Sequence, residues 1–291
     1  MNSSLSSNQI NFYLIFFKSL WCTSMSLFHR EWERTTWQLS HLVENRWLPL
    51  RIRGARFLSI LGVVFWFKFG FRLILIIFTG LGVILLIFIW FRDVSREGAF
   101  QGHHTFLVQG SLKWGLIWFL FREVWFFFRV FWGFFHVRIA PLSGGRYSWP
   151  FTGLNVIPPF QVPLLNTLIL LMRGLTATLG HQEILGGVKS VWVLVRVVLG
   201  LYFLSLQGVE YIASSFSMAS GSYGSVFFFG TGFHGLHVCL GAAMLAVRRL
   251  RINRHLIRAY HHFGLEFSLW YWHFVDVVWL FLFFWIYTWG R

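Results

Sequence analysis

The sequence is poor in charge, and above all in acidic residues. Only 12% of its 291 residues are charged, and 25 Lys and Arg stand against ten Asp and Glu. A soluble domain carries roughly 25% charged residues and needs polar side chains to cover its surface. The composition therefore excludes a soluble globular protein.

Cysteine is also scarce. Cys22 and Cys239 are the two cysteines, too few and too far apart for a disulfide framework or a zinc knuckle. The sequence also lacks a phosphate-binding glycine loop and any recognisable spacing of a nucleophile and its base. We therefore expect no catalytic residue and no metal site in this chain.

Apolar side chains dominate instead. Hydrophobic residues make up 56% of the chain and aromatic residues 21%, and the mean hydropathy is +0.62. Because a helix needs about 20 mostly apolar residues to cross a bilayer, the long apolar runs predict an all-α integral membrane protein with seven transmembrane helices. The predicted spans lie near residues 57–67, 73–91, 112–135, 162–180, 188–212, 226–247 and 267–289.

The basic residues flank these spans and do not form one polar domain, so we expect no nucleic-acid partner. If the N-terminus lies on the positive side, that side holds 16 Lys and Arg, against five on the other. This bias places the N-terminus in the mitochondrial matrix or the bacterial cytoplasm. Residues 1–46 lack a secretory signal; we expect a retained N-terminal extension, with a mitochondrial presequence as the open alternative.

Ionisable residues inside the spans cost at least about 2.5–3.5 kcal/mol at the membrane centre, so each needs an explanation. Glu123 is either a neutral, hydrogen-bonded acid or a proton-linked site, and the residues alone do not choose. His273 and Asp276 lie three apart on one helix face, which predicts an intramembrane pair. His234 and His237 share that spacing, but no Glu or Cys near them completes a metal site.

Four stretches carry a resemblance to a known family. They are WFRDVSREGAFQGHHT at 90–105, QVPLLNT at 161–167, YGSVFFFGTGFHGLHV at 223–238 and HHFGLEFSLWYWHFVDVVWLFLFFWIYTWG at 261–290. In this order they resemble cytochrome c oxidase subunit III, a core subunit of the respiratory heme–copper oxidase. The resemblance runs from about Trp47 to the end, so residues 47–291 are predicted to form the subunit III domain.

The resemblance implies a two-helix bundle and a five-helix bundle in a V-shaped arrangement, with phospholipids, including cardiolipin, in the cleft. It implies a non-catalytic core subunit without heme or copper of its own. Such a chain packs against subunit I, which holds the oxygen-reducing centre, and against accessory subunits. It is expected to support proton uptake in the mitochondrial inner membrane, or in a bacterial plasma membrane.

The resemblance also assigns roles to individual residues. Glu123 matches the family's buried, proton-associated carboxylate. The expected lipid-binding residues are Trp90, Arg96, Glu97, His104 and Arg251.

The chain departs from the family in four arginines within its spans: Arg122, Arg129, Arg173 and Arg196. A guanidinium stays protonated, so each needs an anion, a carbonyl or water. With Asp276 assigned to His273, we predict that at least two of the four contact lipid phosphates or residues of subunits other than subunit I.

Two further functions remain open: subunit III of a quinol oxidase, and a stand-alone transporter, although transporters usually show paired repeats and broken helices.

Overall fold

The computed structural model describes residues 41, 43, 45–69, 73–139, 149, 154–186, 191–254, 256 and 262–290. Its elements are all helical, and no strand occurs among the described residues. The chain divides into two compact units, Met1–Ser111 and Leu112–Arg291.

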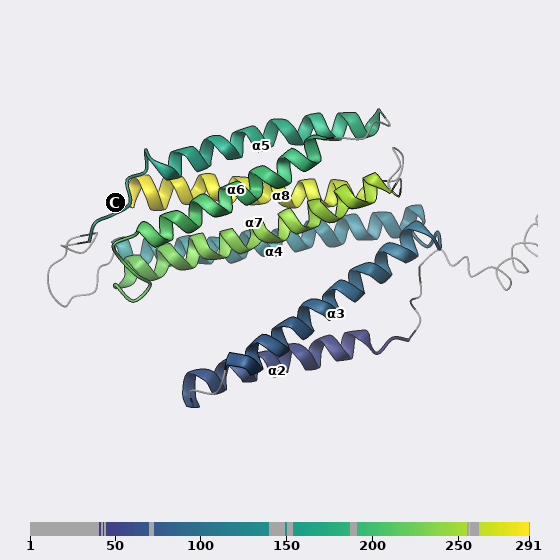
Figure 1. Ribbon diagram of the computed structural model, residues 1–291, viewed down its shortest axis with the longest axis horizontal. Helices are drawn as coiled ribbons and strands as arrows, with labels where there is room; N and C mark the ends of the chain where they lie inside the picture. Colours follow the sequence, from purple (N-terminus) through teal and green to yellow (C-terminus); the bar gives the residue numbers. More distant parts are fainter. Residues whose placement is uncertain are drawn as a thin grey trace, which may run out of the picture. The chain divides into compact units, whose positions relative to one another are not determined.

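The first unit is built on two helices that pack side by side, α2 (Leu48–Phe69) and α3 (Leu73–Ala99) (Figure 1). Pro49 lies in the first turn of α2, where a missing N–H leaves no helical bond unmade. The helix α3 ends where Gly102 adopts a left-handed backbone conformation, with φ of 69°. That turn lets the N–H of His103 donate to the carbonyl of Glu97 at 3.2 Å, which satisfies a carbonyl at the helix end.

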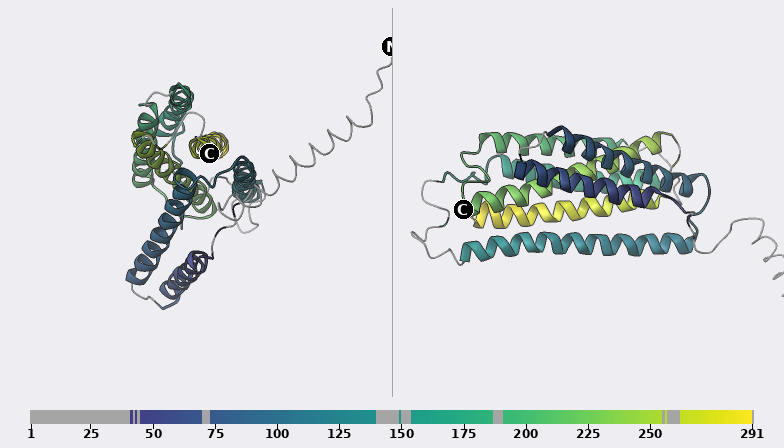
Figure 2. Two further views of the ribbon diagram at one scale, coloured as in Figure 1. Left: turned by 90° about the vertical axis from the view of Figure 1, so that its right-hand side faces the viewer. Right: turned by 90° about the horizontal axis from the view of Figure 1, so that it is seen from below.

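The second unit is a bundle of five helices and one π-helical segment. The helices are α4 (Phe106–Ile139, whose first residues belong to the first unit), α5 (Val162–Leu185), α6 (Trp192–Ala213), α7 (Ser222–Asn253) and α8 (Phe263–Leu282), and α8 continues as η1 (Phe283–Trp289). Figure 2 shows α5 to α8 running along one common direction. Several helices that are neighbours in the chain pack together, and α5 also packs against α8.

The prediction of an all-α membrane protein with seven helices is confirmed. Five of these helices are long and apolar enough to cross a membrane: α3, α5, α6, α7 and the continuous α8–η1 helix. The other two, α2 and α4, carry more basic residues, although with 22 and 34 residues they are long enough to span. The V-shaped arrangement remains a prediction from the resemblance.

Each predicted span overlaps one helix; several helices extend beyond their spans, whereas α6 begins four residues after its span does. The first was expected over residues 57–67 and begins at Leu48. Charged and polar residues extend the helices beyond their apolar runs, because the backbone remains helical where side chains reach water. Residues 1–40 lie outside the described part of the chain, so the N-terminal extension over 1–46 stays a prediction.

One tryptophan fixes the centre of the second unit. The indole of Trp272, on α8, is fully buried and lies against Gly200 of α6 and Gly241 of α7. A Cβ added at Gly200 would meet its ring at 2.8 Å, and one added at Gly241 would meet it at 2.4 Å. The two glycines therefore allow three helices to approach around one large side chain.

Candidate functional sites

Glu123 lies near the middle of α4 and contacts two side chains. Its Oε1 accepts hydrogen bonds from Arg122, with Nη2 at 2.6 Å. Its Oε2 lies 3.2 Å from Nε2 of His237, on α7. Phe127 and Tyr271 pack their rings against the same imidazole, so this end of the carboxylate lies among aromatic groups.

The imidazole of His237 has one fixed proton. Its Nδ1 lies 2.7 Å from the carbonyl oxygen of Phe233, and because a carbonyl can only accept, Nδ1 carries hydrogen. The contact between Nε2 and Oε2 then also needs a proton between the two atoms. Either Glu123 is protonated and His237 neutral, or Glu123 is ionised and His237 charged. The hydrogen bond between the two side chains therefore requires one proton between Nε2 and Oε2.

A second buried ionic cluster joins α5, α6 and α8. Arg173 and Arg196 are 0% and 1% exposed. Arg173 donates from Nη2 to Oδ1 of Asp276 at 2.9 Å. Arg196 lies further away, with Nη2 3.9 Å from Oδ2. Both guanidinium groups face the ring of Trp272, at 5.0 and 5.5 Å from its centroid.

This cluster corrects one pairing that the sequence suggested. Asp276 was assigned to His273, but the ion pairs that the structure shows for Asp276 are to Arg173 and Arg196; the side chain of His273 is exposed. The two arginines reach Asp276 from neighbouring helices and carry a permanent charge, which a histidine does not.

The buried arginines also narrow the expectation that two of the four contact lipid or other subunits. Arg173 and Arg196 are enclosed by their own bundle, so only Arg122 and Arg129 can fulfil the prediction. It stays a prediction for Arg122 and Arg129, whose side chains are exposed on α4.

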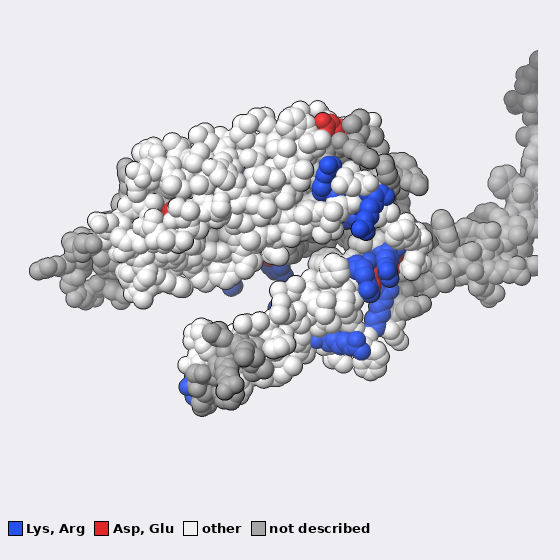
Figure 3. Space-filling model, viewed as in Figure 1, with Lys and Arg blue, Asp and Glu red and all other residues white. Residues whose placement is uncertain are grey.

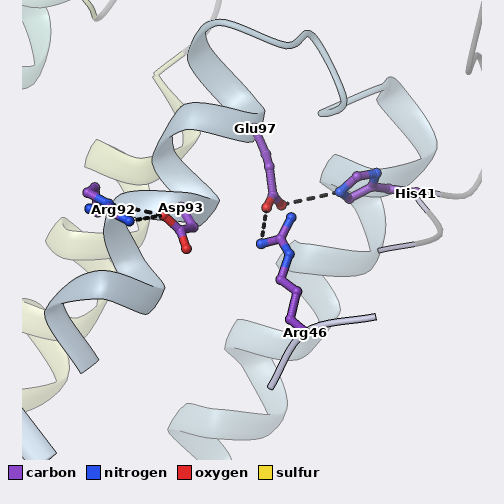
Figure 4. Close-up of polar contacts among 5 residues, drawn as sticks. All are labelled: His41, Arg46, Arg92, Asp93 and Glu97. Carbon is purple, nitrogen blue, oxygen red and sulfur yellow. Dashed lines mark hydrogen bonds and ion pairs between the residues drawn. The ribbon is translucent and has the colours of Figure 1, made fainter. Parts of the chain in front are cut away.

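In the first unit, Glu97 is the centre of a polar network (Figure 4). It is 6% exposed, at the end of α3. Arg46 forms an ion pair with its Oε1, and Nε2 of His41 lies 3.2 Å from its Oε2. The ring of His41 stacks on His103 with centroids 4.4 Å apart. The network ties the segment before α2 to the end of α3.

The five predicted lipid-binding residues are only partly brought together. Glu97 and His104 lie close, because the ring of His104 packs against Gly98. Trp90 and Arg96 are exposed on α3. Arg251 lies in the last turn of α7, in the second unit. In Figure 3, many of the Lys and Arg visible on each unit lie near one end of its helices, and others lie further along them; the topology remains a prediction.

A buried polar group on α6 was not predicted from the sequence. Glu210 is 4% exposed, and neither carboxylate oxygen has a hydrogen-bond partner among the described residues. On the same helix, Nε2 of Gln207 donates to the hydroxyl of Tyr287 at 3.3 Å. Because Glu210 lies at the polar end of an apolar run, only its burial in the fold reveals it.

One group of side chains has the composition of a metal site, although none was predicted. His181 of α5 and His262 and Glu266 at the start of α8 place ligand atoms within 4.8 Å of one another. Within this group, His262 and Glu266 already form an ion pair at 3.1 Å. That pairing accounts for two of the three side chains without a metal ion.

These features define a class of protein: an all-helical membrane protein with buried ionic and polar groups between its helices. The model of the family "Cytochrome c oxidase subunit III" matches residues 39–291, so the chain belongs to that family. Similar proteins named cytochrome c oxidase subunit 3 include that of Scyliorhinus canicula, 45% identical over 254 residues, which are 86% of this chain and 97% of the relative. Those of Gadus morhua and Paracentrotus lividus are both 46% identical, with the same shares of each chain.

Proposed function

We propose that the chain is a core subunit of cytochrome c oxidase that contains no redox centre of its own. It packs against subunit I and accessory subunits of the complex, whose heme and copper transfer electrons from cytochrome c to oxygen. Its membership of the subunit III family over residues 39–291 carries this proposal. The vertebrate and sea-urchin relatives favour the mitochondrial inner membrane, with the N-terminus in the matrix.

The pair of Glu123 and His237 supports a role in proton uptake. It places one exchangeable proton among aromatic side chains, at 3.2 Å between Oε2 and Nε2. Arg122, whose side chain is 70% exposed, donates to the same carboxylate. A group of this kind can receive a proton near subunit I and release it again without leaving an uncompensated buried charge.

We further propose that Arg96, His104 and the exposed Trp90 bind phospholipid headgroups at the end of α3. Glu97 already pairs with Arg46, and this ion pair positions the segment before α2. The phosphate of the lipid would then bind to Arg96. Arg251, in the last turn of α7, has the charge to bind an anionic lipid such as cardiolipin.

Purification through an affinity tag on this chain tests the proposed function. The isolated complex should oxidise reduced cytochrome c and consume oxygen. A complex that oxidises quinol but not cytochrome c would favour a quinol oxidase. A chain that purifies alone from gently solubilised membranes would contradict both.

A further inference from the structure

The ionic cluster around Asp276 does not balance its own charge. Arg173 and Arg196 each carry a positive charge that they cannot shed, and Asp276 supplies at most one negative charge. All three are buried in the five-helix bundle. The interior therefore holds a net charge of at least one, and an isolated buried charge costs several kcal/mol.

The rest of the second unit offers no second carboxylate for Arg196. From Leu112 to the end the sequence contains five acidic residues, and none of them falls in the undescribed segments. Glu123 pairs with Arg122 and Glu266 pairs with His262. The remaining two are Glu183 and Glu210, and neither forms an ion pair with these arginines among the contacts of the described residues.

Arg196 has more unpaired hydrogen-bond donors than Arg173, the other arginine of the cluster. Among the described residues, its Nε, Nη1 and Nη2 have no hydrogen-bond partner, and neither does Nε1 of Trp272. The guanidinium carbon of Arg196 lies 5.5 Å from the centroid of the Trp272 ring, so these donors share one neighbourhood. Oδ2 of Asp276 is the acceptor nearby, 3.9 Å from Nη2 of Arg196 and also without a hydrogen-bond partner among the described residues. Donors and positive charge still outnumber acceptors and negative charge here, which favours an anion over a cation.

The position of Arg196 near the start of α6 also favours an anion. Arg196 is the fifth residue of the helix that begins at Trp192, about 6 Å from its start at 1.5 Å per residue. The N-terminal end of a helix carries a partial positive charge that attracts anions.

We propose that Arg196, with Trp272, binds a small inorganic monovalent anion, for which chloride is the probe. One negative charge neutralises the net positive charge of the cluster. A single-atom anion can accept hydrogen bonds from several N–H groups at once. A lipid phosphate is excluded because Arg196 is 1% exposed. The anion would link α5 and α6 by offsetting the positive charge on Arg173 and Arg196 that Asp276 leaves uncompensated.

Chloride titration of the intact oxidase complex tests the proposal. The complex is purified in gluconate, chloride is added at constant ionic strength, and the unfolding temperature of this chain is followed. Chloride at 100 times its dissociation constant should favour the folded state about 100-fold. Absence of any chloride dependence overturns the proposal.

Two variants assign the effect to the site. Arg196→Leu leaves the balanced pair of Arg173 and Asp276 and should abolish the chloride dependence. Arg254→Leu removes an exposed arginine at the end of α7 and should keep it. If Arg196→Leu retains the full dependence, chloride acts elsewhere and the proposal fails.

A direct observation uses the native complex, so it does not depend on how well a variant folds. In a high-resolution map of the complex prepared in bromide, an ion should lie within hydrogen-bonding distance of Arg196. A map at saturating bromide with water alone at these nitrogens would overturn the proposal.

Discussion

The contact between Glu123 and His237 depends on two different kinds of neighbour. The carbonyl of Phe233 fixes the hydrogen on Nδ1, and the carboxylate faces the other nitrogen. A hydrogen bond between them exists only with a proton in place. The acid and the imidazole are thus one site, and neither residue has this property alone.

The substitution Glu123→Gln removes the ionisable carboxyl group but can keep its hydrogen bonds. The amide can still accept from Arg122 and donate to Nε2 of His237, so destabilisation should be about 1 kcal/mol or less. It cannot exchange a proton, so we expect slower proton uptake during turnover with unchanged heme content. Time-resolved uptake with a pH dye measures this.

Glu183→Gln, at the end of α5, is the matched control, because it removes a carboxylate outside the pair. It should leave the rate unchanged. Equal rates for the native complex and Glu123→Gln would rule out a role for this carboxylate in proton uptake.

Single residues also show where sequence reasoning stops. The polarity of Glu123 within an apolar run is enough to mark it as a candidate site. Its partner could not be predicted, because His237 lies 114 positions away on another helix. For Asp276 the sequence offered a neighbour on the same helix, whereas the fold supplies a stronger one from α5. Contacts within one helix follow from spacing, and contacts between helices follow from packing.

At the scale of helices, the packing around Trp272 determines how closely α6 and α8 approach. Gly200→Ala places a methyl group 2.8 Å from the ring, and overpacking of this kind costs about 1–3 kcal/mol. We expect a lower unfolding temperature of the chain within the complex. Differential scanning fluorimetry of the purified complex measures this shift.

Gly208→Ala on the same helix is the control, since nothing lies within 4 Å of its added Cβ. It should be neutral or raise stability by about 0.5–1 kcal/mol, because alanine favours the helix. Equal losses for the two variants would mean that the contact with Trp272 does not set the effect.

The helices themselves could be predicted from the sequence because length and hydropathy decide them. Val162–Leu185 begins at the predicted residue. The ends were harder, since α2 begins at Leu48, whereas the predicted span began at residue 57. An apolar run marks the part of a helix inside the membrane, and backbone hydrogen bonding continues beyond it.

For the whole molecule, scarcity of acid is the organising feature. From Leu112 onward, five acidic residues face 14 Lys and Arg. Most of these basic residues lie towards the ends of the predicted spans, where water and headgroups compensate them. The arginines inside the bundle have few carboxylates to pair with, so Arg173 and Arg196 share Asp276 and leave a net positive charge. Subunit membership follows from sequence similarity, whereas this charge imbalance becomes visible only in the fold.

The central claim is that this chain is a core subunit of cytochrome c oxidase without a redox centre. The most direct test is metal analysis and heme spectroscopy on the tagged complex and on the subunit separated from it. The complex should contain heme and copper in fixed proportion to this chain, and the separated subunit should contain neither. Stoichiometric heme or copper on the separated subunit, or a pure complex without heme, would contradict the account.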